Sequence, residues 1–185
     1  MLVLASASPR RADLLRAAGI PFTVETPDID EWPLANEPPE SYVLRVARDK
    51  ALAVARRKSG SPVLGADTTV VVDGGILGKP SDDAEARTML QRLSGRVHDV
   101  LTGVALEVGG GEWTALEITR VRFLPLSAGE IDWYIASGEP RGKAGAYAIQ
   151  GLASRFVDRV EGSYTNVVGL PVPAVCGLLR QARVL

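Results

Sequence analysis

The stretch "PVLGADTTVVVDGGILGKP", residues 62–80, combines a buried strand, a tight turn and a short return strand. The apolar residues on either side of Asp67 are typical of a strand inside a sheet. Asp73-Gly74-Gly75 is typical of a β-hairpin turn, in which the backbone needs positive φ angles. A strand that returns through a hairpin departs from strict alternation of strands and helices, so this stretch indicates a mixed α/β fold.

Working outward from this stretch, apolar spacing and turn residues predict the other elements. The long helix before it has its apolar stripe at Val43, Val46, Ala47, Ala51 and Val54. Ser8 is a candidate N-cap with Pro9 at the first helical position, Gly19 ends that helix, and Ser81 or Asp82 caps another. We expect further strands over 2–6, 21–27, 147–151 and 154–162, a long hairpin over 97–126, and helices over 9–18, 41–58, 81–96, 127–138 and 171–185.

Length and composition exclude several classes of protein. A chain of 185 residues suits a single domain, residues 1–185, with room for two lobes. The net charge of -1 disfavours a sequence-independent nucleic-acid binder, which carries a positive surplus. Cys176 and His98 are each the only residue of their type, which excludes an internal disulfide and a multi-histidine metal site. With no membrane-spanning stretch and no signal-peptide pattern, we expect a soluble cytoplasmic protein without a membrane partner.

The stretch "SASPRR", Ser6 to Arg11, places two arginines where a strand passes into a helix. Because a helix N-terminus carries a positive dipole and unpaired N–H groups, cations there are unfavourable unless an anion lies between them. Ser8, Arg10 and Arg11 could therefore bind a polyphosphate. The alternative is a pair of solvated arginines on the outer face of the helix, and this segment alone leaves both open.

Three further residues suggest phosphate chemistry. Lys50 lies on the inward stripe of its helix, where a lysine either reaches the surface or points into a cleft. Asp67 interrupts a buried strand, where a carboxylate is costly unless it ligates a cation or accepts a proton. Lys79 follows a glycine and precedes a proline, so a rigid turn holds it where it could neutralise a phosphate. The residues around it do not form a P-loop, because Asp73 and Pro80 replace the required glycine and hydroxyl.

Two loops supply the other candidates. The acidic loop contains Asp28, Asp30, Glu31 and Glu40, and one of these together with Asp67 could hold a divalent cation shared with a triphosphate. The glycine-rich segment "GEPRGKAGAYAIQG" contains Gln150, whose amide donates and accepts in a way that suits the imide edge of a pyrimidine. An ordinary glycine-rich connection is the alternative there.

Taken together, "SASPRR", "GADTTVVVDGGILGKP", "LSGRVHDVLTGV", "SGEPRGKAGAYAIQG" and "GSYTNVVGLP" resemble the successive motifs of the Maf family of nucleoside triphosphate pyrophosphatases. The motifs occur in the family's order and cover nearly the whole chain. Two small departures are Ala148, where a glycine is usual, and Thr165, where a serine is common.

The resemblance implies a mixed-sheet, two-lobed, inosine-triphosphatase-like (Maf/Ham1-like) fold around a central cleft, possibly as a homodimer. It implies hydrolysis of a nucleoside triphosphate to the monophosphate and pyrophosphate with Mg²⁺ or Mn²⁺. Asp67 would accept the proton of the attacking water and, with Glu31, hold the metal. By motif position, Arg10, Thr68 and Gln150 would select the substrate, and Ser8, Arg11, Lys50 and Lys79 would bind its phosphates.

The form "KAGAYAIQG" is similar to the branch of the family that acts on dTTP and UTP, including modified uridine triphosphates. Such an activity would suit removal of unwanted nucleotides. One alternative is a pyrophosphatase for 7-methyl-GTP or another non-standard nucleotide. A second is a non-catalytic regulator of cell division, which the family's label of septum formation inhibitor suggests.

Overall fold

The computed structural model describes all residues from 1 to 185 and has the expected mixed α/β fold. Its seven-stranded sheet has the order β2-β1-β3-β5-β6-β7, with β4 paired to β3. Strand β1 is parallel to both β2 and β3, whereas the β3–β4 and β6–β7 pairs are antiparallel. The elements are β1 (Leu2–Ala5), α1 (Pro9–Ala17), β2 (Phe22–Glu25), α2 (Pro39–Ala55), β3 (Val63–Val72), β4 (Gly75–Leu77), α3 (Asp83–Leu93), β5 (Val97–Val108), β6 (Gly111–Phe123), α4 (Ala128–Ala136), two 3₁₀ turns (Ala144–Ala146 and Leu152–Phe156), β7 (Val157–Glu161), α5 (Tyr164–Val168) and α6 (Val172–Gln181).

The chain divides into two compact units, in line with the expected two lobes. The first consists of Met1–Thr68, Thr102–Glu117 and Gly169–Leu185, and the second of Thr69–Leu101 and Ile118–Val168. The expected single domain over residues 1–185 and the cleft between lobes stay predictions. No helix in either unit is both long enough and apolar enough to cross a membrane.

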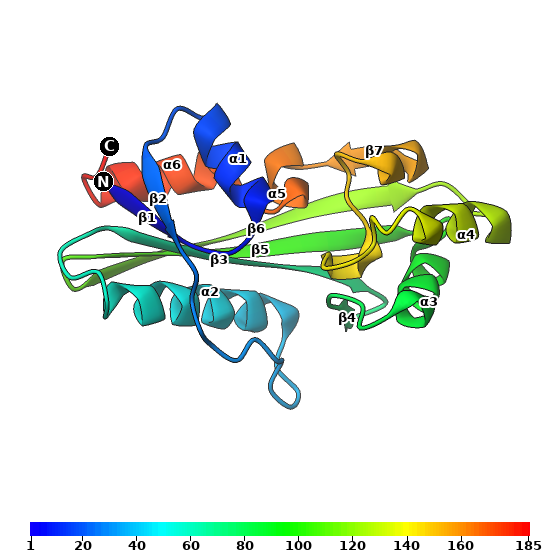
Figure 1. Cartoon of the computed structure of the whole chain (residues 1–185), viewed down its shortest axis with the longest axis horizontal. Coiled ribbons are helices and arrows are strands. Elements are labelled where there is room, and N and C mark those ends of the chain that lie inside the picture. The colour runs from blue at the N-terminus through cyan, green and yellow to red at the C-terminus, as the bar shows by residue number, and fades with distance from the viewer. The chain divides into compact units, whose positions relative to one another are not determined.

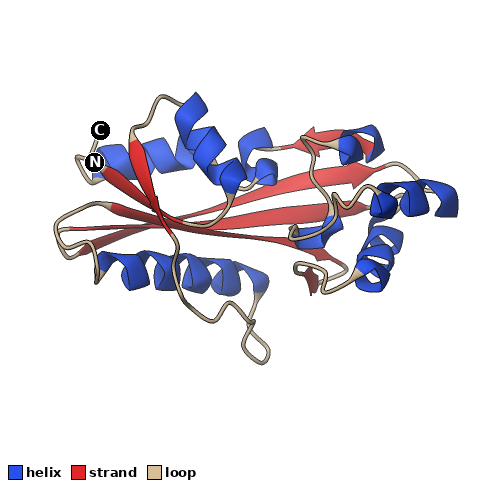
Figure 2. Ribbon diagram, in the orientation of Figure 1, coloured by secondary structure: helices blue, strands red, loops and turns tan.

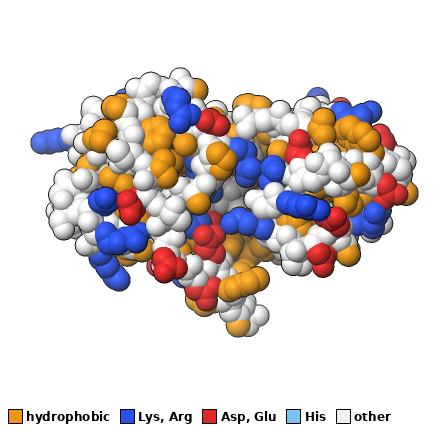
Figure 3. Space-filling model, viewed as in Figure 1, with side chains coloured by type: hydrophobic (Ala, Val, Ile, Leu, Met, Phe, Trp, Pro, Cys, Tyr) orange, Lys and Arg blue, Asp and Glu red, His pale blue; other side chains and the backbone are white.

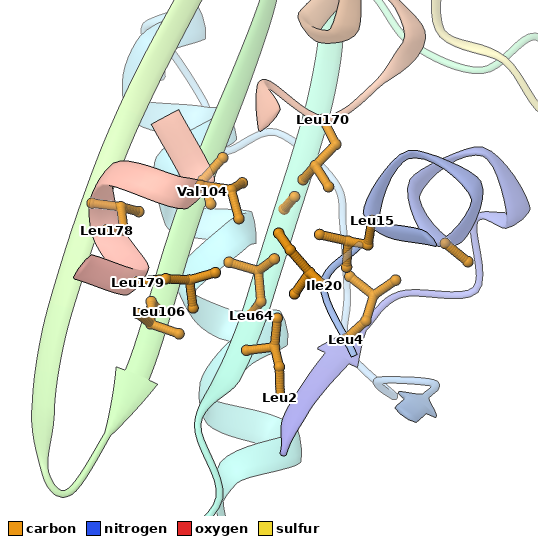
Figure 4. Close-up of a cluster of buried hydrophobic side chains, with 13 residues drawn as sticks. Leu2, Leu4, Leu15, Ile20, Leu64, Val104, Leu106, Leu170, Leu178 and Leu179 are labelled. Carbon is orange, nitrogen blue, oxygen red and sulfur yellow. The ribbon is translucent and has the colours of Figure 1, made fainter. Parts of the chain in front are cut away.

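The first unit has helices on both faces of its strands. Helices α1 and α6 cover one face and α2 the other, as Figures 1 and 2 show. Leu15 of α1 and Leu179 of α6 pack with Leu4, Leu64 and Leu106 of the strands, in the apolar cluster drawn in Figure 4. On the opposite face, the apolar stripe of α2 packs on small strand residues: Val3, Ala5, Val63 and Ala105 against Ala47, Ala51 and Val54.

The second unit is held together by aromatic side chains. Phe123 lies edge-on to both His98 and Tyr147, with ring centroids 5.0 and 4.8 Å apart. Phe156 contacts Tyr134 of α4 in the same way, at 5.3 Å. His98 of β5 is buried, and its Nε2 atom is hydrogen-bonded to the Tyr147 hydroxyl at 2.9 Å.

Several local predictions are confirmed. The β3–β4 hairpin turns at Asp73 and Gly74, which have φ angles of 50° and 73°. Asp82 caps α3 by accepting from the Glu85 N–H, and Gly19 follows α1 with a φ of 69°. Ser8 is the N-cap residue of α1 and Pro9 is the first helical residue, but the Ser8 side chain makes no capping hydrogen bond.

Two local predictions are wrong. Residues 147–151, expected as a strand, form a loop and turn instead. The short helix α5 is a second difference, since no helix was expected between 138 and 171. The predicted strand over 154–162 is confirmed only for β7, since the 3₁₀ turn Leu152–Phe156 precedes it.

Candidate functional site

The first unit contains a buried cluster of one lysine and two carboxylates. Lys50 Nζ lies 2.8 Å from Asp67 Oδ1 and 3.0 Å from Glu31 Oε2. The side chains of Lys50 and Asp67 are almost fully buried, and that of Glu31 is 38% exposed. A buried charge is tolerated when it is paired, so Lys50 and Asp67 make each other's burial possible, and the partly exposed Glu31 adds a second negative charge to the ammonium. Lys50 therefore points inward, and Glu31 and Asp67 come together as predicted.

Two glycines allow α2 to bring Lys50 this close to the sheet. A Cβ atom on Gly65 of β3 would lie 2.1 Å from the carbonyl oxygen of Ala47. A Cβ atom on Gly103 of β5 would lie 2.4 Å from the carbonyl oxygen of Val43. Since both neighbours are backbone atoms of α2, any larger residue would push the helix outward. Lys50 follows Ala47 by one turn, so these glycines set its depth.

The loop that carries Glu31 is tied to α2 at two points. The Tyr42 hydroxyl donates to the Glu31 carbonyl oxygen at 2.9 Å. Arg45 pairs with Glu37 through two hydrogen bonds of 2.6 and 2.8 Å and donates to the Trp32 carbonyl at 3.1 Å. The hydrogen bonds from Arg45 lower the pKa of Glu37 to about 2. The loop is thereby anchored at Glu31 and on its C-terminal side. Asp30 makes a hydrogen bond within the loop, because its carboxylate accepts from the Trp32 N–H.

Arg11 is buried at the start of α1 and bonded to protein atoms. Its guanidinium donates to the Gly169 carbonyl at 2.8 Å, and to Ser6 Oγ and Thr68 Oγ1 at 3.1 Å each. Burial lowers the pKa of Arg11, and the negative charges of Asp67 and Glu31 oppose that shift. Three of its five N–H groups are thus engaged within the protein. Arg11 therefore links α1 to the residues around the site and also places a positive charge next to Asp67 and Glu31.

Thr68 and Ser8 belong to the same neighbourhood. Thr68 Oγ1 lies 2.8 Å from Thr102 Oγ1, in addition to its bond with Arg11. The Ser8 N–H donates to Ser6 Oγ at 3.2 Å. Arg10 and Ser8 are each half-buried on the first turn of α1. The first unit therefore contains seven of the predicted site residues: Ser8, Arg10, Arg11, Glu31, Lys50, Asp67 and Thr68.

The other two predicted residues, Lys79 and Gln150, belong to the second unit. Both are exposed, Lys79 shortly after β4 and Gln150 in the turn before the second 3₁₀ element. On the face of the molecule drawn in Figure 3, basic and acidic side chains are interspersed.

Sequence reasoning missed two residues of the first-unit site. Thr102 is fully buried against Thr68, and Tyr42 supports Glu31. A hydroxyl within the apolar run "VLTGVAL" is the same kind of signal that identified Asp67, so Thr102 could have been found. Tyr42 has no comparable signal, because it lies beside Val43 on the apolar stripe.

The donor set suits one kind of divalent cation. No group of three or more histidine, cysteine, aspartate or glutamate side chains could hold a metal ion. The carboxylates of Asp67 and Glu31, however, are within hydrogen-bond distance of one ammonium group. Mg²⁺ is commonly held by one or two carboxylates together with substrate phosphates and water. The residues therefore fit a cation shared with a polyphosphate, and do not fit a site made of protein ligands alone.

Comparison with known proteins agrees with this arrangement. The family description "Maf-like protein" matches residues 1–182. A dTTP/UTP pyrophosphatase of Symbiobacterium thermophilum is 55% identical over 180 residues, covering 97% of this chain and 93% of the relative. A dTTP/UTP pyrophosphatase of Myxococcus xanthus is 57% identical over 182 residues, covering 98% and 92%.

Among solved structures, the Ham1 protein of Staphylococcus aureus is similar over 66% of this chain and 71% of its own, with a TM-score of 0.44 and 12% identity. That similarity is too low to support an argument about function. The match over nearly the whole length identifies this chain as a member of the Maf-like protein family.

Proposed function

We propose that this protein hydrolyses dTTP and UTP, and modified uridine triphosphates, to the nucleoside monophosphate and pyrophosphate. The observation that carries the proposal is the identity of 55–57%, over nearly the full chain, to relatives named dTTP/UTP pyrophosphatase. The buried Lys50–Asp67 pair supports it, because a carboxylate held by a lysine is a suitable base beside a polyanion.

In this mechanism Asp67 activates a water molecule. Lys50 donates to Oδ1 and orients the carboxylate, and Oδ2 takes the proton of the water. The water oxygen forms a bond to phosphorus, and the bond between the α- and β-phosphates breaks. The electron pair of that bond leaves with the departing phosphate oxygen.

Charge neutralisation is the other part of the proposed mechanism. Arg11, Lys50, Lys79 and the first turn of α1 at Ser8 would bind the phosphates. A bound Mg²⁺ or Mn²⁺, held by Asp67 and Glu31, would supply further positive charge to the developing phosphate oxygens. Arg10, Thr68 and Gln150 would select the substrate, with the Gln150 amide reading the imide edge of thymine or uracil. The removal of unwanted nucleotides, the cytoplasmic location, the homodimer and the link to septum formation stay predictions.

Pyrophosphate release from a panel of triphosphates, with and without Mg²⁺ or Mn²⁺, tests the proposal. The panel contains dTTP, UTP, 5-methyl-UTP, CTP, 7-methyl-GTP and ITP. We expect fast, metal-dependent release from dTTP, UTP and 5-methyl-UTP. Release from 7-methyl-GTP alone would keep the chemistry and change the substrate. No release from any nucleotide by the folded protein would favour a non-catalytic regulator.

A further inference from the structure

Gln150 lies in a tight turn of the second unit. The Gly151 N–H donates to the Ala148 carbonyl oxygen at 3.0 Å, which closes a four-residue turn with Ile149 and Gln150 at its centre. Ile149 is buried and Gln150 is exposed, so the turn directs these two side chains to different environments. No strand pairs with this segment, and its remaining backbone groups need other partners.

The Glu139 carboxylate binds the backbone directly after the turn. Its Oε2 accepts from the Leu152 N–H at 2.9 Å, and its Oε1 accepts from the Ala153 N–H at 3.3 Å. Oε1 also accepts from the Tyr134 hydroxyl at 2.8 Å. One carboxylate therefore receives three hydrogen bonds, two of them from consecutive backbone groups.

Tyr134 extends the same network to the near side of the turn. Its hydroxyl oxygen accepts from the Ala148 N–H at 3.2 Å, and the same hydroxyl donates a hydrogen bond to Glu139. Tyr134 is fully buried, and its pKa is raised by burial and then by the hydrogen bond to Glu139. A buried hydroxyl in two hydrogen bonds has a fixed orientation. The two residues together hold the turn on both sides of Gln150.

Gly151 leaves the space that the Glu139 carboxylate occupies. A Cβ atom on Gly151 would lie 2.2 Å from Glu139 Oε2. The only way to accommodate even a methyl group is to move the carboxylate or the turn. Because Glu139 itself has a flexible side chain, the carboxylate would move first.

We propose that Glu139 is the positioning residue that sets base selectivity, because it holds the turn on which Gln150 is presented. The inference rests on the proposed function and deepens it. Glu139 does not touch the substrate in this scheme. It acts through the Leu152 and Ala153 N–H groups and through Tyr134.

The test compares Glu139→Gln with wild type. The amide keeps the shape of the side chain but replaces one acceptor oxygen with a donor, which would face an N–H or hydroxyl donor. We expect the ratio of kcat/KM for UTP to kcat/KM for CTP to fall about tenfold, since hydrogen bonds to a carboxylate are lost. We also expect amide hydrogen exchange at Leu152 and Ala153 to become at least about tenfold faster.

Two further variants separate this role from a loss of folding. Gly151→Ala leaves Glu139 in the sequence but displaces its carboxylate, and should reproduce both effects. Glu130→Gln alters a carboxylate that also accepts from backbone, the Ser127 N–H, at the exposed start of α4, and should change neither. An unchanged substrate ratio in both Glu139→Gln and Gly151→Ala, from an active wild type, would overturn the proposal. If wild type releases no pyrophosphate, both the proposed function and the selectivity role of Glu139 are wrong. The hydrogen-exchange measurement then still decides whether Glu139 holds the turn.

Discussion

Lys50 Nζ and Asp67 Oδ1 lie 2.8 Å apart in a buried ion pair that joins α2 to β3. We predict that Asp67→Asn lowers kcat by at least about a thousandfold, because the amide cannot accept the proton of the attacking water. The amide oxygen still accepts from Lys50, so the variant should fold. Steady-state pyrophosphate release and circular dichroism measure the two effects. Asp13→Asn, at an exposed carboxylate paired with Arg16, is the matched control. Turnover near the wild-type rate in Asp67→Asn would exclude Asp67 as the base.

The two arginines of "SASPRR" should respond differently to truncation. Arg10 is half-buried on the first turn of α1, so we predict that Arg10→Ala raises KM about tenfold and weakens discrimination among bases, with little change in melting temperature. An unaltered substrate profile would exclude Arg10 from substrate selection.

Arg11→Ala should instead reduce stability. It removes three buried or partly buried hydrogen bonds, to the Gly169 carbonyl oxygen and to the hydroxyls of Ser6 and Thr68. We expect a loss of about 3 kcal/mol in the free energy of unfolding, measured by urea titration. A loss below about 1 kcal/mol would mean that these bonds are readily replaced by water.

The close approach of α2 to the sheet predicts the effect of Gly65→Ala. The added methyl group would meet the Ala47 carbonyl oxygen, so the helix must shift. We expect a loss of about 2–3 kcal/mol, or roughly 4–12 °C in melting temperature, together with a lower kcat as Lys50 moves from Asp67. Gly177→Ala, in α6 with no atom within 4 Å of the added Cβ, is the control and should be neutral or slightly stabilising.

His98 predicts a pH dependence of stability. Burial lowers the pKa of His98 to about 4 from 6.5, so the folded protein holds the imidazole neutral. The contribution of neutral His98 to the free energy of unfolding is complete above pH 6.5. It is lost as the pH falls toward 4, because the unfolded chain binds the proton at a higher pH than the folded protein does. The full effect is about 3 kcal/mol. Unfolding free energies between pH 4 and 7 should therefore fall less steeply in His98→Gln than in wild type. Parallel curves for the two proteins would contradict this assignment.

The sequence was a good guide where one periodic pattern determined a residue's environment. The apolar stripe of α2 placed Lys50 on the inward side of the helix, although it left open whether the side chain reaches the surface. The hairpin turn at Asp73 and Gly74 followed from their tolerance of positive φ. The partners of Lys50 were harder, because Asp67 and Glu31 come from a strand and a loop whose positions depend on tertiary packing. That these carboxylates share one lysine is visible only in the structure.

Residues 147–151 show how a correct pattern can mislead. Tyr147 and Ile149 are buried and Gln150 is exposed, which is the alternation of a strand. The Ala148 N–H nevertheless donates to the Tyr134 hydroxyl, and the Gly151 N–H donates to the Ala148 carbonyl oxygen, instead of to a neighbouring strand. Helix α5 was missed for a different reason. With five residues it is too short to show helical periodicity, and it begins where Ser163 Oγ accepts from the Asn166 N–H.

The bond between Arg11 and the Gly169 carbonyl joins residues 158 positions apart. During synthesis this hydrogen bond cannot form until nearly the whole polypeptide has left the ribosome, because residues are added in order from the N-terminus. A chain released early, before residue 169, would have to bury a cation without that partner or leave the start of α1 undocked. We therefore expect incomplete products of this protein to expose their N-terminal segment, and exposed termini are where proteolysis concentrates.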